Sequence, residues 1–178
     1  ATETEDMVTT HSAENARDLQ SLLRKAGPRD TIELNGQFGE VRLAGIRPEA
    51  TVTLRAAKPG AAHFEKLILG DCANIAFAGL TMWPLAPVPR VDRKLYLIHA
   101  YPDCAGIEVS DTLFRGRADS DNHAKWTLAD WTEAKIGAAL LRGPNSVIRN
   151  NAAIGVNFGY GVSGKNSEIF GNLIFGFS

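Results

Sequence analysis

Short apolar segments recur along most of the chain, and two of them have nearly the same sequence. Residues 145–151 read NSVIRNN and residues 166–172 read NSEIFGN, which gives an offset of 166 − 145 = 21 residues. A fixed period near 20 residues, built from short strands with no helical pattern between them, is typical of a stacked β-coil. One coil buries its inner face only against the next coil, so the pattern predicts a β-solenoid.

The apolar segments predict about six coils, with one inward-pointing residue taken from each. Two long intervals in the series are expected to carry loops that leave the solenoid intact. The expected inward column consists of Ile32, Val52, Ile75, Ile107, Ile148 and Ile169.

The residues three positions before the last four members of this column are expected to stack on one another at a bend. Asparagine suits such bends because its amide donates and accepts hydrogen bonds between coils, and because it tolerates a left-handed backbone. Equivalent residues of neighbouring coils lie about 5 Å apart, so the two cysteines are predicted to be neighbours within reach of a disulfide. The four residues are Cys72, Cys104, Asn145 and Asn166.

Residues 12–28 have the pattern of an amphipathic helix. Ser12 stands where it can cap the helix, and Gly27 and Pro28 end it. This helix is predicted to cover the apolar end of the first coil. The chain is thereby divided into an N-terminal arm (1–11), a capping helix (12–28) and a β-solenoid (29–178). The apolar face of the helix consists of Ala16, Leu19, Leu22, Leu23 and Ala26.

The coil pattern, the repeated Asn segments and the preceding helix together resemble the right-handed parallel β-helix superfamily of pectate lyases and phage tailspikes. The resemblance covers about residues 29–178. It implies an all-β fold, a right-handed parallel β-helix (solenoid) with an N-terminal capping α-helix. Many functions share this fold, so the resemblance implies a polysaccharide as partner without selecting an activity.

Composition excludes some classes of function. A formal net charge of −1 over 178 residues argues against a general nucleic-acid binder. No apolar run approaches 18 residues, so no membrane insertion is expected. Two cysteines do not form a disulfide framework. We predict neither a metal nor a cofactor, and we expect an extracellular location or one on the surface of a virion-like particle.

Two insertions are the candidate binding elements, and they are expected to leave the solenoid at the same corner. The first follows Met82 and the second follows Phe114; the offset is 114 − 82 = 32 residues, equal to 107 − 75 = 32 between two residues of the column. In a solenoid, inserted loops gather on one face, which is often the binding face.

Each insertion carries tryptophans and arginines that suit an acidic glycan, because an indole stacks on a sugar ring and a guanidinium binds a carboxylate through two hydrogen bonds. The alternative for the first insertion is a proline-stiffened loop that folds its tryptophan over the coil. The alternative for the second is a satellite apolar cluster under a long loop, beside a short helix capped by Thr127 and packed through Leu128. The predicted glycan-binding residues are Trp83, Arg90, Arg93, Arg115, Arg117, Trp126 and Trp131.

Three further patterns are weaker. Residues 119–123 alternate oxygen-bearing side chains like the start of a calcium loop, but Ala124 stands where such a loop needs Gly. Asp71 and Asp103 form the best stacked acidic pair, with turn hydrogen bonds as the alternative to cation binding. Glycines at 155, 159 and 161 alternate with large residues, which predicts either a bare outer face that receives a ligand or tight turns.

Three functions remain open. The first is a carbohydrate-binding module of a surface or phage-like spike or fibre protein that recognises a polysaccharide. The second, implied by the resemblance, is a polysaccharide lyase or epimerase acting on an acidic glycan, although no stacked catalytic carboxylates or bases are found. The third is a structural solenoid segment. Phe175 and Phe177 fall on core positions in the last coil, so a further C-terminal domain or a homo-oligomer partner is expected to cover them.

Overall fold

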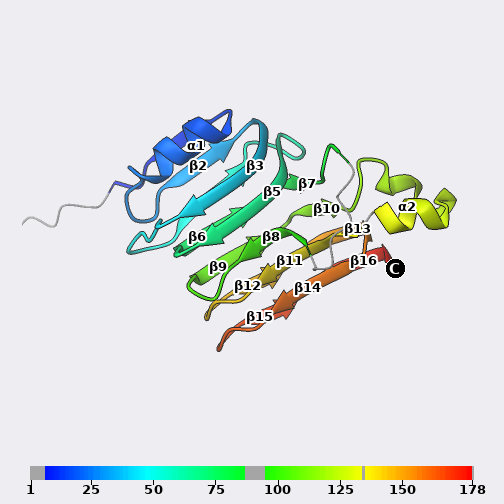
Figure 1. Cartoon of the computed structure of the whole chain (residues 1–178). Coiled ribbons are helices and arrows are strands. Elements are labelled where there is room, and N and C mark those ends of the chain that lie inside the picture. Colours follow the sequence, from blue (N-terminus) through cyan, green and yellow to red (C-terminus); the bar gives the residue numbers. More distant parts are fainter. Residues whose placement is uncertain (1–6, 87–94, 134, 178) are drawn as a thin grey trace, which may run out of the picture.

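A computed structural model describes residues 7–86, 95–133 and 135–177, which form a right-handed parallel β-helix, as expected. Each pair of adjacent strands in this part of the chain is parallel, and the coils stack from the N-terminal to the C-terminal end (Figure 1). The first sheet has seven strands in the order β1 (Thr10–Ala13), β2 (Thr31–Leu34), β4 (Val52–Ala56), β6 (Ala73–Ala78), β9 (Ala105–Ser110), β12 (Val147–Arg149) and β15 (Glu168–Phe170).

The second sheet is folded along a corner that runs down the stack. Its first strands, β3 (Gly36–Ala44) and β5 (Ala62–Gly70), are long, and β5 pairs with β7 near its start and with β8 near its end. Below β5 the sheet therefore divides into two faces. One face contains β7 (Thr81–Met82), β10 (Leu113–Arg115), β13 (Ala152–Val156) and β16 (Leu173–Phe177); the other contains β8 (Tyr96–Ala100), β11 (Gly137–Leu141) and β14 (Phe158–Val162).

The N-terminal helix α1 (Ala16–Leu23) lies at one end of the stack (Figure 1). Leu19 and Leu23 are buried in the common core, so the helix covers the end of the first coil as expected. Its predicted start is wrong: Ser12 belongs to β1, and the Asn15 side chain caps the helix by accepting the Asp18 N–H at 3.0 Å. Residues 10–13 form a strand instead because they pair in register with β2.

The predicted inward column is correct in side-chain direction and wrong in register at two places. Ile32 pairs with Leu54 rather than with Val52, and Ile148 pairs with Val109 rather than with Ile107. Both errors are shifts of two residues, and a two-residue shift leaves every side chain on the same face of a strand. The first five members are therefore buried as expected, at 1 % exposure or less: Ile32, Val52, Ile75, Ile107 and Ile148.

Left-handed residues align in two columns, one at each end of the first sheet. One column contains Asn74, Gly106, Asn145 and Asn166, and the other, five residues later in each coil, contains Gly79, Asp111, Asn150 and Gly171. Their φ angles lie between 50° and 72°. Asn145 and Asn166 are neighbours as predicted, but the residue above Asn145 is Gly106 and not Cys104. Gly, Asn and Asp occupy these bends because they tolerate positive φ best.

The two cysteines lie on adjacent coils, as predicted. Their following residues, Ala73 and Ala105, are a register pair, and the Ala105 N–H donates to the Cys72 carbonyl at 3.0 Å. Both thiols are buried and unbonded to one another. A hydrogen bond from Cys104 lowers the pKa of Cys72 to about 7.

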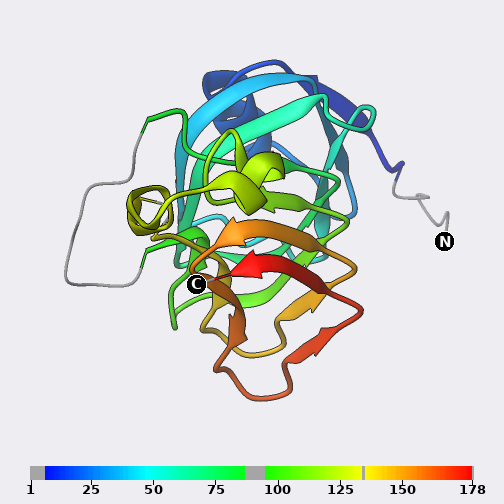
Figure 2. The ribbon, with the colours of Figure 1, turned by 90° about the vertical axis from the view of Figure 1, so that its right-hand side faces the viewer.

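Both insertions leave the solenoid at one corner, which confirms the prediction, because Met82 and Phe114 are paired in register. The second insertion contains the 3₁₀ helix η1 (Ser120–Lys125) and the helix α2 (Leu128–Glu133). In Figure 2 these helical segments lie in front of the stacked strands. In the part of the chain that the structure describes, no helix has both the length and the apolarity to cross a lipid bilayer.

Candidate functional site

The first insertion begins with Trp83, which is anchored to the coil above. The Trp83 N–H donates to the Phe64 carbonyl at 3.2 Å, and the Trp83 carbonyl lies 3.1 Å from Nε2 of His63. The buried His63 ring also contacts the indole, with 4.2 Å between centroids. Arg115, at the start of the second insertion, places its guanidinium 5.0 Å from the centre of the Trp83 ring. The expected proximity of Trp83 and Arg115 is therefore observed.

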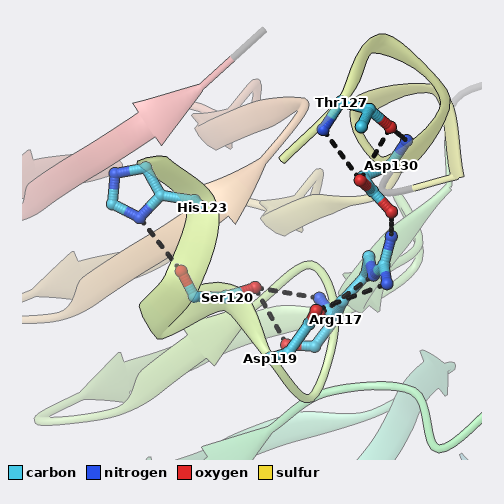
Figure 3. A network of polar contacts seen from close by, with 6 residues as sticks. All are labelled: Arg117, Asp119, Ser120, His123, Thr127 and Asp130. Carbon is cyan, nitrogen blue, oxygen red and sulfur yellow. Dashed lines mark hydrogen bonds and ion pairs between the residues drawn. The ribbon is translucent and has the colours of Figure 1, made fainter. Parts of the chain in front are cut away.

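Arg117 is the centre of a polar network that shapes the second insertion (Figure 3). Its guanidinium contacts Asp119 at 3.0 Å and Asp130 at 2.7 Å. Asp130 also accepts hydrogen bonds from the N–H and hydroxyl of Thr127 at 2.8 and 2.7 Å, so Thr127 and Asp130 form the predicted cap of α2. The Thr127 hydrogen bonds and then Arg117 lower the pKa of Asp130 to about 2. The insertion is thus held together by charges within it.

Trp126 and Trp131 form an aromatic pair beside this network. Their ring centroids are 4.8 Å apart in an edge-to-face arrangement, and the Arg117 guanidinium lies 5.1 Å from the Trp126 ring. Both indoles are half-buried. A Cβ at Gly155 of β13 would be only 2.6 Å from Cη2 of Trp126, so the indole packs directly against that backbone. Leu128 is 84 % exposed, and the expectation that it packs on the solenoid is wrong because α2 turns this residue to solvent.

The arginines that the structure places at the corner already have acidic partners. Arg115 contacts Asp121 at 2.9 Å, and Arg117 contacts Asp119 and Asp130. Arg90 and Arg93 lie outside the described residues. The corner therefore presents aromatic surface whose neighbouring cations are neutralised, which suits stacking on sugar rings better than binding carboxylates.

The prediction of a bare glycine face is wrong. The position of a Cβ at Gly159 is 2.2 Å from Cδ1 of Ile174, and that at Gly155 falls between Trp126 and Ser120. The glycines are small because side chains of neighbouring coils and of the second insertion occupy the space beside them. Gly155 also has φ +61°, a conformation that glycine adopts without strain.

The acidic side chains do not converge on a cation. Asp119 and Asp121 point to different arginines, and Asp71 forms an ion pair with Arg47 at 2.8 Å. Within residues 7–86, 95–133 and 135–177, no three His, Cys, Asp or Glu side chains are grouped as metal ligands.

Sequence reasoning missed one pair of functional candidates, His99 and Tyr101, on and just after β8. Their rings are 4.7 Å apart, and Tyr101 is 41 % exposed on the outer side of the sheet. Burial, and then the charges of Arg142 and Lys66, lower the pKa of His99, so its imidazole is neutral near pH 7. The signal was the alternation around it: His99 stands between Ile98 and Ala100, both fully buried.

Comparisons with known proteins agree with the fold. No family model and no curated protein matches the sequence. Among solved structures, the chain is similar to the crystal structure of an alginate lyase from Paenibacillus sp. str. FPU-7, with 14 % sequence identity and a TM-score of 0.45. The match covers 94 % of this chain and 76 % of that protein.

Proposed function

We propose that this chain binds a polysaccharide on the side of the β-helix that carries the two insertions. The observation that carries the proposal is the aromatic cluster of Trp83, Trp126 and Trp131 at one corner of the solenoid. Two inserted segments, separated by a complete coil in sequence, supply these side chains. A polysaccharide ligand fits a protein that is displayed outside the cell or on a particle.

The packing of the cluster supports this function. The three indoles are half-buried, so each is held by contacts on one side while part of its surface stays in solvent. Rigid, partly exposed indoles lose little conformational freedom when a sugar stacks on them. The ion pairs of Arg115 and Arg117 add rigidity to the second insertion. Each stacking contact is weak, and repetition along a polymer supplies avidity.

The test is binding of soluble polysaccharides to the wild type and to Trp83→Ala and Trp131→Ala variants, measured by affinity electrophoresis. Each variant is expected to weaken binding at least threefold, or roughly 0.7 kcal/mol at the conversion of 1.4 kcal/mol per tenfold. Leu128→Ala is the matched control, because it removes an exposed apolar side chain from the same insertion. Trp126→Phe keeps a ring against Gly155 and tests the third position. Unchanged binding in all three tryptophan variants would move the site away from the corner.

Eliminative cleavage of an acidic polysaccharide is the second candidate function, and the pair of His99 and Tyr101 favours it. A neutral imidazole can take the proton from the carbon next to a uronate carboxylate. The bond to the leaving oxygen then breaks, a carbon–carbon double bond forms, and the Tyr101 hydroxyl protonates the leaving oxygen. The assay is ultraviolet absorbance of the unsaturated product. His99→Ala and Tyr101→Phe are expected to abolish product formation while binding remains; product formed at the wild-type rate by both variants would exclude this candidate.

A further inference from the structure

The outer face of β5, β8 and β11 forms a continuous surface next to the corner. In these strands Leu67, Leu69, Ile98 and Ala139 are fully buried in the core. Side chains alternate along a strand, so the residues between them point outward. The pairing of Ile68 with His99, and of His99 with Leu140, places His99 on the middle strand of this face.

Two cations stand at opposite ends of a diagonal through His99. Lys66 lies two residues before Ile68 on β5, and Arg142 lies two residues after Leu140, just beyond β11. His99 is the midpoint of this line in both directions. Four residues along the strands and two steps between strands put the Cα atoms of Lys66 and Arg142 roughly 16 Å apart.

The charges on this diagonal are not neutralised within the chain. Among the described residues, no carboxylate lies within ion-pair distance of Lys66 or Arg142, whereas Arg42 on the neighbouring strand β3 contacts Glu40 at 2.9 Å. The Glu65 carboxylate accepts the Leu85 N–H at 3.0 Å instead. This differs from the corner, where the arginines have acidic partners.

Aromatic surface lies between the two cations. Tyr101 is half-exposed, its ring lies 4.7 Å from that of His99, and it rests beside Gly70, whose Cβ position is 3.7 Å from the Tyr101 ring. The diagonal therefore runs from a cation over two rings to a second cation. Carboxylates bind free cations, and sugar rings stack on aromatic faces.

We propose that Lys66 and Arg142 bind two carboxylates of one polyuronate chain that crosses this face diagonally, over His99 and Tyr101. The inference rests on the proposed polysaccharide binding and adds the ligand class, a carboxylated polymer, and the residues that select it. The separation of the two cations requires an oligomer, because a single sugar cannot reach both.

The experiment compares polygalacturonate with its carboxyl-reduced, neutral form, and adds monomeric galacturonate, using isothermal titration calorimetry at fixed salt. The wild type is expected to bind the native polymer at least tenfold more tightly than the reduced polymer, since each charge-assisted hydrogen bond contributes about tenfold or more. The monomer is expected to bind at least a hundredfold more weakly than the polymer. In the double variant Lys66→Gln/Arg142→Gln, the gap between native and reduced polymers is expected to close. Arg24→Gln/Lys25→Gln removes the same charge at the exposed end of the capping helix and is the matched control.

Each other outcome overturns a different statement. If neither polymer binds the wild type, the proposed function fails. If both polymers bind equally, polysaccharide binding stands and the selection of carboxylates fails. A gap that persists in the Lys66/Arg142 double variant, or that closes equally in the helix control, removes the assignment to this face. Circular dichroism of both double variants checks that they fold.

Discussion

Replacement of Asn151 by Ala is expected to be among the most destabilising single changes in the solenoid. Asn151 is 2 % exposed and belongs to a ladder at the second bend. Its Oδ1 accepts the Thr112 N–H at 2.9 Å, and its Nδ2 donates to the Val109 carbonyl at 3.0 Å and to Oδ1 of Asn172 at 3.0 Å. One side chain therefore connects three consecutive coils.

The magnitude follows from these contacts. Three side-chain hydrogen bonds at about 1 kcal/mol each, and a buried Thr112 N–H left without an acceptor, give a loss of about 4 kcal/mol in the free energy of unfolding. That is a large share of the roughly 5–15 kcal/mol that stabilises a typical domain. Asn172→Ala is the matched control: Asn172 makes similar bonds at the half-buried next rung, so a loss of only about 1–2 kcal/mol is expected there.

Urea denaturation measures both losses, and amide hydrogen exchange locates them. The Thr112 amide is expected to exchange much faster in Asn151→Ala than in the wild type, because its acceptor is gone. The ladder argument is refuted if Asn151→Ala costs less than 1 kcal/mol, if Asn172→Ala costs as much, or if Thr112 stays protected.

Three further outcomes are expected. Gly155→Ala should displace the indole of Trp126 and quench or shift its fluorescence, with a stability loss of about 2 kcal/mol, because the residue has positive φ and no room for a Cβ; an unchanged emission spectrum contradicts the packing described. Burial lowers the pKa of His63 below 6.5, so the neutral form is favoured in the folded state; this contribution to stability is complete above pH 6.5 and is lost as the pH falls below it, and His63→Gln should flatten urea stability between pH 7 and 5 relative to the wild type. In Cys104→Ala, thiolate absorbance at Cys72 should titrate well above the value of about 7 in the wild type, since the first-ranked cause of the lowered pKa, the hydrogen bond from Cys104, is removed; an unchanged midpoint contradicts this cause.

Much of the fold was predictable because its determinants repeat. Asn145 and Asn166 begin two copies of one segment, and equal offsets place equal residues beside one another. The same logic predicted that Cys72 and Cys104 are neighbours and that the insertions share a corner. The register errors at Ile32 arose because sequence offsets alone cannot distinguish positions two residues apart on the same face.

The candidate site was predictable only in part. The corner and its tryptophans follow from the position of the insertions, but the partners of Arg115 and Arg117 do not. The carboxylates that neutralise them lie within aperiodic segments, whose conformation depends on local packing rather than on a repeat. Charge counting in the sequence therefore could not tell a free arginine from a paired one.

The sequence by itself determined which side chains face the core, since alternation along a strand is a local property of the backbone. It also determined where the bends fall, because Asn, Asp and Gly mark the left-handed positions. Only the tertiary structure decided that Lys66, His99 and Arg142 lie on one line. Their offsets of 99 − 66 = 33 and 142 − 99 = 43 residues differ because each coil contains an insertion of its own length, and only strand pairing converts those unequal distances along the chain into equal steps across the sheet.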